Sequence, residues 1–172
     1  MHHSGDRDDA ATCDRYEDEF AAWDGLLQAH TAVARGLDAD LRAAHGLPLS
    51  EFEVLLWLAR RPCQQMRMAA LAASALLSPS GVSRAVERLE ARGLVRRERC
   101  REDRRGMLAT LTGEGQALIA AAGATLAASI RTRMLDHLTL EERQGLAAVC
   151  QRLAATSEGA AQSCPGWDTK GR

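Results

Sequence analysis

The hydrophobic pattern changes from helical to strand-like near Gly93, and this change restricts the possible folds more than any other feature of the sequence. In "SPSGVSRAVERLEARG", Val82, Val86 and Leu89 recur at helical spacing and predict a buried stripe. Ser78 can cap this helix, and Gly93 can end it. The next runs, "LVRRERC" and "MLATLT", favour strands, and the polar "REDRRG" between them is typical of a hairpin loop. Because "MRMAALAASALL" predicts another short helix just before Ser78, the segment indicates a helix-turn-helix followed by a β-hairpin, which is a winged helix.

Longer helical patterns lie on both sides of this winged helix, which we place at about residues 48–111. They cover about residues 14–45 before it and 113–136 and 140–156 after it. The predicted fold class is therefore mainly α with a small β-hairpin wing. Residues 14–157 are predicted to form a single domain, between a disordered acidic arm at 1–13 and a disordered tail at 158–172.

Several polar residues are spaced to begin these helices. In "LPLSEFEVLLWLARRP", Ser50 and Glu53 have the spacing of a capping box, and Pro62 can stop the helix. Thr112 can cap the helix that follows the hairpin. A second capping box is predicted at Thr139 and Glu142.

Composition agrees with a helical, intracellular protein. Aromatic residues make up only 3% of the chain, while alanine and leucine recur throughout, which favours helices packed through aliphatic side chains. No apolar run approaches the roughly 18 to 20 residues that span a bilayer. The five cysteines are scattered and include no CxxC pair, so we expect reduced thiols, a cytoplasmic location and no membrane contact.

Positive charge is concentrated in one region, although the whole chain has a formal net charge of −1. Residues 84–105 contain nine arginines and five acids, whereas residues 1–24 contain eight acids and two arginines. Binding to nucleic acid requires a basic face and not a basic chain. The sequence therefore predicts that double-stranded DNA is bound through the segment around residues 84–105.

Within that segment, the two parts of the winged helix have different predicted roles. A helix in the major groove reads base edges and phosphates with its outward side chains, here Ser80, Ser83, Arg84 and Arg88. At the hairpin tip, Arg104 and Arg105 can enter the minor groove, and Arg97 and Arg99 can support them through phosphate contacts. Phosphate would repel Asp103, so we expect its carboxylate to orient a wing arginine.

The order and spacing of these segments resemble the MarR family of bacterial winged helix-turn-helix regulators. The resemblance runs from "LSEFEVLLWLA" through "MAALAASALLSPSGVSRAVERLEARGLVRRE" to "REDRRGMLATLTGEG". It implies a homodimer whose terminal helices interlace and whose two lobes bind a pseudo-palindromic operator, and a dimer of this kind is expected to act as a repressor. It also implies that a small-molecule effector could release the DNA.

The effector and its site are less constrained by the sequence. Trp23 and Glu53, with an arginine near the wing, are similar to the residues of the urate-responsive branch, and His30 lies on the apolar side of its helix. Cys13 leaves open a thiol-based redox sensor. A helical protein-interaction module with a winged-helix shape is the alternative from another class. No phosphate loop, GxSxG, HExxH or paired metal-ligand motif is present, so we expect no enzyme activity, no cofactor and no metal site.

Overall fold

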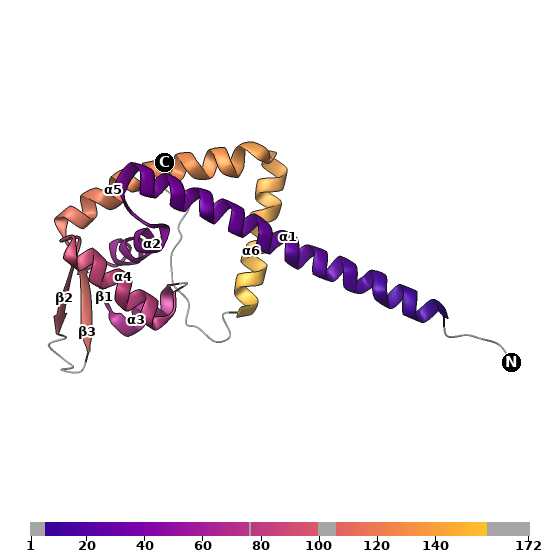
Figure 1. Ribbon diagram of the computed structural model, residues 1–172, viewed down its shortest axis with the longest axis horizontal. Helices are drawn as coiled ribbons and strands as arrows, with labels where there is room; N and C mark the ends of the chain where they lie inside the picture. Colours follow the sequence, from indigo (N-terminus) through magenta and orange to yellow (C-terminus); the bar gives the residue numbers. More distant parts are fainter. Residues whose placement is uncertain (1–5, 76, 100–105, 158–172) are drawn as a thin grey trace. The chain divides into compact units, whose positions relative to one another are not determined.

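The computed structural model describes residues 6–75, 77–99 and 106–157, with side chains from residue 20 onward (Figure 1). The chain divides into two compact units, Met1–Arg131 and Thr132–Arg172. The first unit contains the helices α1 (Asp6–His45), α2 (Leu49–Ala59), α3 (Met68–Ser74), α4 (Pro79–Ala91) and most of α5 (Gly113–Arg133), together with the strands β1 (Gln65–Arg67), β2 (Val95–Arg99) and β3 (Met107–Leu111). The second unit contains a 3-10 turn (Leu135–His137) and α6 (Leu140–Ser157). The predicted winged helix and mainly α fold class are confirmed.

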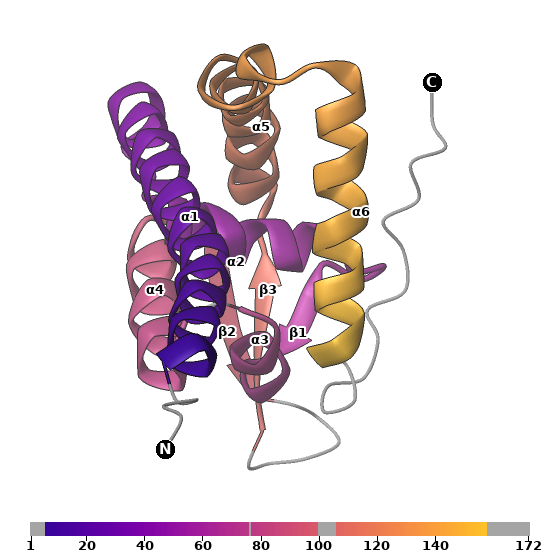
Figure 2. The same cartoon turned by 90° about the vertical axis from the view of Figure 1, so that its right-hand side faces the viewer.

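The sheet has one strand more than the sequence predicted. β3 lies between β1 and β2 and pairs antiparallel with both (Figure 2). The predicted hairpin forms with Val95 opposite Leu111 and Arg99 opposite Met107. β1 adds three residues on the other edge, where Met66 faces Ala109 and is buried. The three-residue strand ties the start of α3 to the base of the wing.

One apolar core holds the helix-turn-helix against the sheet. α2, α3 and α4 surround it, and the stripe predicted from periodicity is fully buried. The completely buried residues of the core include Leu41, Val54, Leu55, Leu58, Leu71, Val82, Val86 and Leu89. This packing fixes the orientation of α4 relative to the sheet.

Two helix starts differ from the predictions. α1 begins at Asp6, so residues 6–13, expected to belong to a disordered arm, are helical. The sequence has no proline or glycine between Gly5 and Gly25, and acidic residues in a first turn interact favourably with the helix dipole. α2 begins at Leu49 without a side-chain cap of its own, so the predicted capping box of Ser50 and Glu53 is wrong.

The cap of α2 comes instead from a neighbouring helix. The Leu49 N–H donates to Asp38 Oδ1 at 2.9 Å. Arg42 holds the same carboxylate at 2.6 Å, and this hydrogen bond lowers the pKa of Asp38. A carboxylate that accepts from the first turn of a helix satisfies a donor that has no partner within that helix. α1 therefore determines where α2 starts.

The other predicted caps form. The Ser78 hydroxyl accepts from the Gly81 N–H at 3.2 Å, and Gly93 has a positive φ of 72° just after α4. Thr112 Oγ1 accepts from the Gly115 N–H at 3.1 Å at the start of α5. In the second unit, the Thr139 N–H donates to Glu142 Oε2 at 2.8 Å, which lowers the pKa of Glu142. These contacts are local in sequence, which is why they were predictable.

α5 lies beside the C-terminal half of α1 (Figure 2). The Ser129 hydroxyl donates to Asp40 Oδ2 at 2.5 Å, and His45 Nε2 lies 2.8 Å from Thr125 Oγ1. Over the described residues, none of the helices combines the length and apolarity needed to cross a membrane.

Candidate nucleic-acid interface

The outer face of α4 carries the predicted recognition residues. Ser80 and Arg84 are exposed and Ser83 is half-buried, while Val82, Ala85 and Val86 turn inward. The hydroxyls of Ser80 and Ser78 are 3.2 Å apart at the start of the helix. Among the residues that the structure describes, Arg84 makes no ion pair. This face therefore presents hydroxyl and guanidinium donors at the N-terminal half of a helix, where a major-groove helix contacts bases.

One flank of α4 is bound to the wing through Arg97. Its Nη2 and Nε both lie 2.6 Å from Glu90 Oε2, and its backbone N–H donates to Glu90 Oε1 at 3.0 Å. Glu87 adds a longer ion pair at 3.6 Å. Hydrogen bonds from Arg97 lower the pKa of Glu90, and the same pairing raises the pKa of Arg97. Arg97, predicted as a phosphate contact, thus has two internal carboxylate partners.

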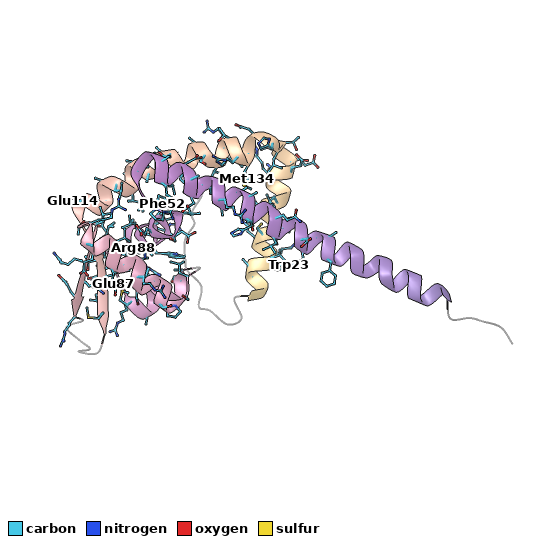
Figure 3. All side chains as sticks on the ribbon, in the orientation of Figure 1. Trp23, Phe52, Glu87, Arg88, Glu114 and Met134 are labelled. Atoms are coloured by element: carbon cyan, nitrogen blue, oxygen red, sulfur yellow. The ribbon has the colours of Figure 1, made fainter. Side chains whose placement is uncertain are left out.

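The other flank of α4 is bound to α2 through Arg88. Figure 3 shows Arg88 and Glu87 on α4. Arg88 Nε donates to Glu51 Oε1 at 2.5 Å, and Arg92 Nη1 lies 3.4 Å from Glu51 Oε2. Glu51 is buried in the first turn of α2. Arg88 is exposed, as predicted, but its guanidinium is already paired with the Glu51 carboxylate.

Neither carboxylate partner was predicted from the sequence. Glu51 stands in an apolar helix and Glu90 follows a buried leucine, and neither position alone signals an arginine partner. A charged residue within an otherwise apolar helical run was the available clue for Glu51, because buried carboxylates are paired.

The wing is described only along its strands. Asp103, Arg104 and Arg105, the predicted tip residues, lie outside the described residues. Arg99 is exposed at the end of β2, and Arg96 pairs with Glu98 at 2.5 Å. The described part of the wing therefore contributes two exposed arginines, of which Arg96 is paired with Glu98 and Arg99 lies next to the predicted tip.

A separate cavity of about 260 Å³ lies between α1, α2 and α5. Two of the three predicted effector residues, His30 and Glu53, line it, and Trp23 does not. The remaining lining is apolar: Val33, Ala34, Leu37, Leu49, Phe52, Leu56 and Leu126. Burial raises the pKa of Glu53, and the charge of His30 partly offsets this. Trp23 is exposed on α1 instead, and its ring stands out from the helix in Figure 3.

Within the described part of the chain, no group of three His, Cys, Asp or Glu side chains could hold a metal ion. Cys63 and Cys150 are exposed thiols. The side chain of Cys13, the candidate redox residue, lies outside the described side chains.

Comparison with known proteins points to one family. Residues 45–106 match the model of the MarR family. A MarR family transcriptional regulator from Streptomyces coelicolor, solved in complex with DNA, is 33% identical, with a TM-score of 0.75, over 86% of this chain and 90% of that chain. AbsC, a MarR family transcriptional regulator from the same organism, is 32% identical, with a TM-score of 0.74, over 83% of this chain and 95% of that chain. Bordetella bronchiseptica BpsR, whose DNA binding is regulated by 6-hydroxynicotinic acid, shares the fold at 21% identity, with a TM-score of 0.67, over 75% of this chain and 89% of that chain. No curated protein sequence matches the chain.

Proposed function

Because the chain belongs to the MarR family of transcriptional regulators, and is therefore a regulator and not an enzyme, we propose that it binds double-stranded DNA sequence-specifically through α4 and the wing. The observation that carries this proposal is the outer face of α4, where Ser80 and Arg84 are exposed beside a strand that carries the exposed Arg99. The similar Streptomyces coelicolor regulator, which was solved in complex with DNA, supports DNA as the ligand.

In this proposal, Ser80, Ser83 and Arg84 contact base edges and nearby phosphates in the major groove. Arg88 does not belong to this set, because its Nε already donates to Glu51. At the wing, Arg104 and Arg105 enter the minor groove with Asp103 as their orienting partner, and Arg99 binds a phosphate. Arg97 holds β2 against α4 through Glu90.

We also propose that the chain acts as a homodimer. On α1, Phe20 and Trp23 are 66% and 59% exposed, and Leu26 and Leu27 are nearly half exposed. In the second unit, Leu140, Val149 and Leu153 of α6 are exposed as well. Apolar helix faces of this kind are covered by association, and two-fold pairing would place two α4 helices about one DNA turn apart. A dimer on a pseudo-palindromic operator would block a promoter, so we propose repression.

The cavity between α1, α2 and α5 is the proposed effector site. Its lining combines seven apolar residues with His30 and Glu53, and no arginine lies among them. An organic anion of the kind that the resemblance to the urate-responsive branch implies has no guanidinium partner in this lining, which favours an apolar effector that donates a hydrogen bond to Glu53. Trp23 is assigned to the dimer interface in place of this site, because it is exposed on α1.

The function is tested by selection from a random-sequence DNA duplex library with the full chain, followed by affinity measurements on the enriched duplex at several salt concentrations. We expect a pseudo-palindromic motif and an affinity that falls steeply as salt rises, because bound arginines release counterions from phosphates. A library that stays random after repeated rounds would contradict the proposal and favour a protein-interaction module.

A further inference from the structure

Glu51 occupies the junction of three helices in the first unit. It is only 2% exposed, and each of its carboxylate oxygens has an arginine partner, Arg88 on α4 and Arg92 directly after it. One of those arginines, Arg92, also donates from Nη1 to the Gly46 carbonyl at 3.1 Å and from Nη2 to the His45 carbonyl at 3.5 Å. Glu51 thus connects the C-terminal end of α4 to α2, and Arg92 extends the connection to the end of α1.

Arg88 is held by this carboxylate and not by burial, whereas Arg92 also donates to the two carbonyls at the end of α1. The side chains of Arg88 and Arg92 are 54% and 37% exposed, whereas that of Glu51 is 3% exposed. A cavity of about 510 Å³, lined also by Arg42 and Ser50, opens beside them. The Arg88 guanidinium therefore has room to turn outward once the carboxylate charge is removed, whereas Arg92 keeps its two carbonyl acceptors.

The position of Arg88 on α4 makes this restraint important. Arg88 follows Arg84 by four residues, so the two lie on adjacent turns of one helix face. A guanidinium released at this edge would bind the phosphates of any DNA sequence, because phosphate contacts carry no sequence information. Such a contact raises affinity for all DNA and lowers discrimination.

We propose that Glu51 is a positioning residue for specificity: it withholds Arg88 from DNA phosphates and, through Arg88 and Arg92, fixes α4 against α2. This inference rests on the proposed function. It assigns opposite roles to two arginines one turn apart, since Arg84 contacts DNA and Arg88 holds the helix that contacts it.

The test compares wild type with Glu51→Gln on the selected duplex and on a scrambled duplex. The amide keeps the shape of the side chain but removes the charge that holds Arg88. We expect binding to the scrambled duplex to tighten and its salt slope to steepen by about 0.9 for each guanidinium that gains a phosphate. The ratio of selected to scrambled affinity should fall by about tenfold, a small part of the usual discrimination. Glu114→Gln, which removes an exposed carboxylate from α5, is the matched control for net charge and should leave the ratio unchanged.

Equal weakening of both duplexes by Glu51→Gln, or an unchanged ratio, would overturn the inference, because a merely structural residue changes both affinities together. If Glu51→Gln does not fold, Arg88→Gln decides. We expect this variant to keep the salt slope on the scrambled duplex, while Arg84→Gln lowers it by about 0.9. A lower slope in Arg88→Gln would overturn the inference. A wild-type chain that prefers no duplex would instead refute the proposed function.

Discussion

The helices α4 and α1 differ in the exposure of their apolar side chains. On α4, Val82, Val86 and Leu89 are completely buried within their own unit. On α1, Phe20 and Trp23 are more than half exposed. Both helices carry apolar residues at helical spacing, so the pattern alone does not distinguish them.

The difference indicates which helix has its apolar side chains covered within one chain. α4 has its buried stripe covered by the core and both flanks bound by carboxylate–arginine pairs, through Glu51 on one side and Glu90 on the other. α1 packs its C-terminal half against its own unit, where Leu41 is buried, and leaves its middle uncovered. Stability of the lobe should therefore depend on α4, and association of two chains on α1.

The largest expected effect is on the core side of α4. Leu89→Ala removes a completely buried side chain, so it should lower the free energy of unfolding by about 2 to 5 kcal/mol, through lost burial and the cavity left behind. Urea denaturation followed by circular dichroism measures the change. A loss below about 1 kcal/mol would mean that the α4 stripe is not the centre of the core.

The next effect is on the outer side of α4. Arg84→Ala should weaken binding to the selected duplex by about 1 to 3 kcal/mol, because it removes a donor to bases or phosphate. Arg35→Ala, at an exposed arginine of α1, is the matched control and should change binding by less than about 0.5 kcal/mol. Fluorescence anisotropy at fixed salt measures both. Equal losses in the two variants would assign the effect to overall charge and remove α4 from the interface.

The sequence predicted those parts of the fold that depend on near neighbours. The cap at Ser78, the stop at Gly93 and the cap at Thr112 each involve residues within one turn of a helix end. The start of α2 was missed because its cap, Asp38, comes from another helix eleven residues away. β1 was missed because three residues are too few for an alternating pattern to be recognised.

The same distinction applies to the candidate site. Ser80 and Arg84 could be placed on the outer face from periodicity alone. The pairing of Arg88 with Glu51 spans 37 positions and depends on how α2 packs against α4, which a helical pattern does not specify. Of the three predicted effector residues, His30 and Glu53 line the cavity, whereas Trp23 lies elsewhere on α1. Contacts between side chains on different helices depend on tertiary packing, whereas periodicity in one sequence predicts only contacts within a helix.

A smaller effect is expected on α1. Leu27→Ala removes the same atoms as Leu89→Ala, but from a side chain that is 47% exposed in the single chain. It should weaken self-association by about 1 kcal/mol per subunit, because roughly half of the side chain remains to be buried in the dimer. Sedimentation equilibrium measures the change. Unchanged association would place the dimer interface away from this part of α1.

The smallest expected effect is on the pH dependence of stability, where Glu53 in the cavity next to α1 and Glu90 on α4 should act with opposite sign. In the cavity next to α1, burial raises the pKa of Glu53 above its ordinary value of 4.5. The folded chain then binds its proton more tightly than the unfolded chain, so stability is highest below the ordinary pKa and falls as pH rises through the folded pKa. Glu53→Gln should remove this fall and stabilise the chain at neutral pH, by less than about 1 kcal/mol because the group is only partly buried.

Glu90, on α4, provides the control of opposite sign. Hydrogen bonds from Arg97 lower its pKa, so its contribution is present above the ordinary pKa and is lost as pH falls through the folded pKa. Glu90→Gln should therefore destabilise the chain at neutral pH, where Glu53→Gln stabilises it. Urea denaturation of wild type and both variants at pH 4.5 and pH 7.5 measures the two signs. If both variants changed stability in the same direction at pH 7.5, Glu53 would be stabilised by a partner in the way that Glu90 is stabilised by Arg97. The two carboxylates would then not differ in sign.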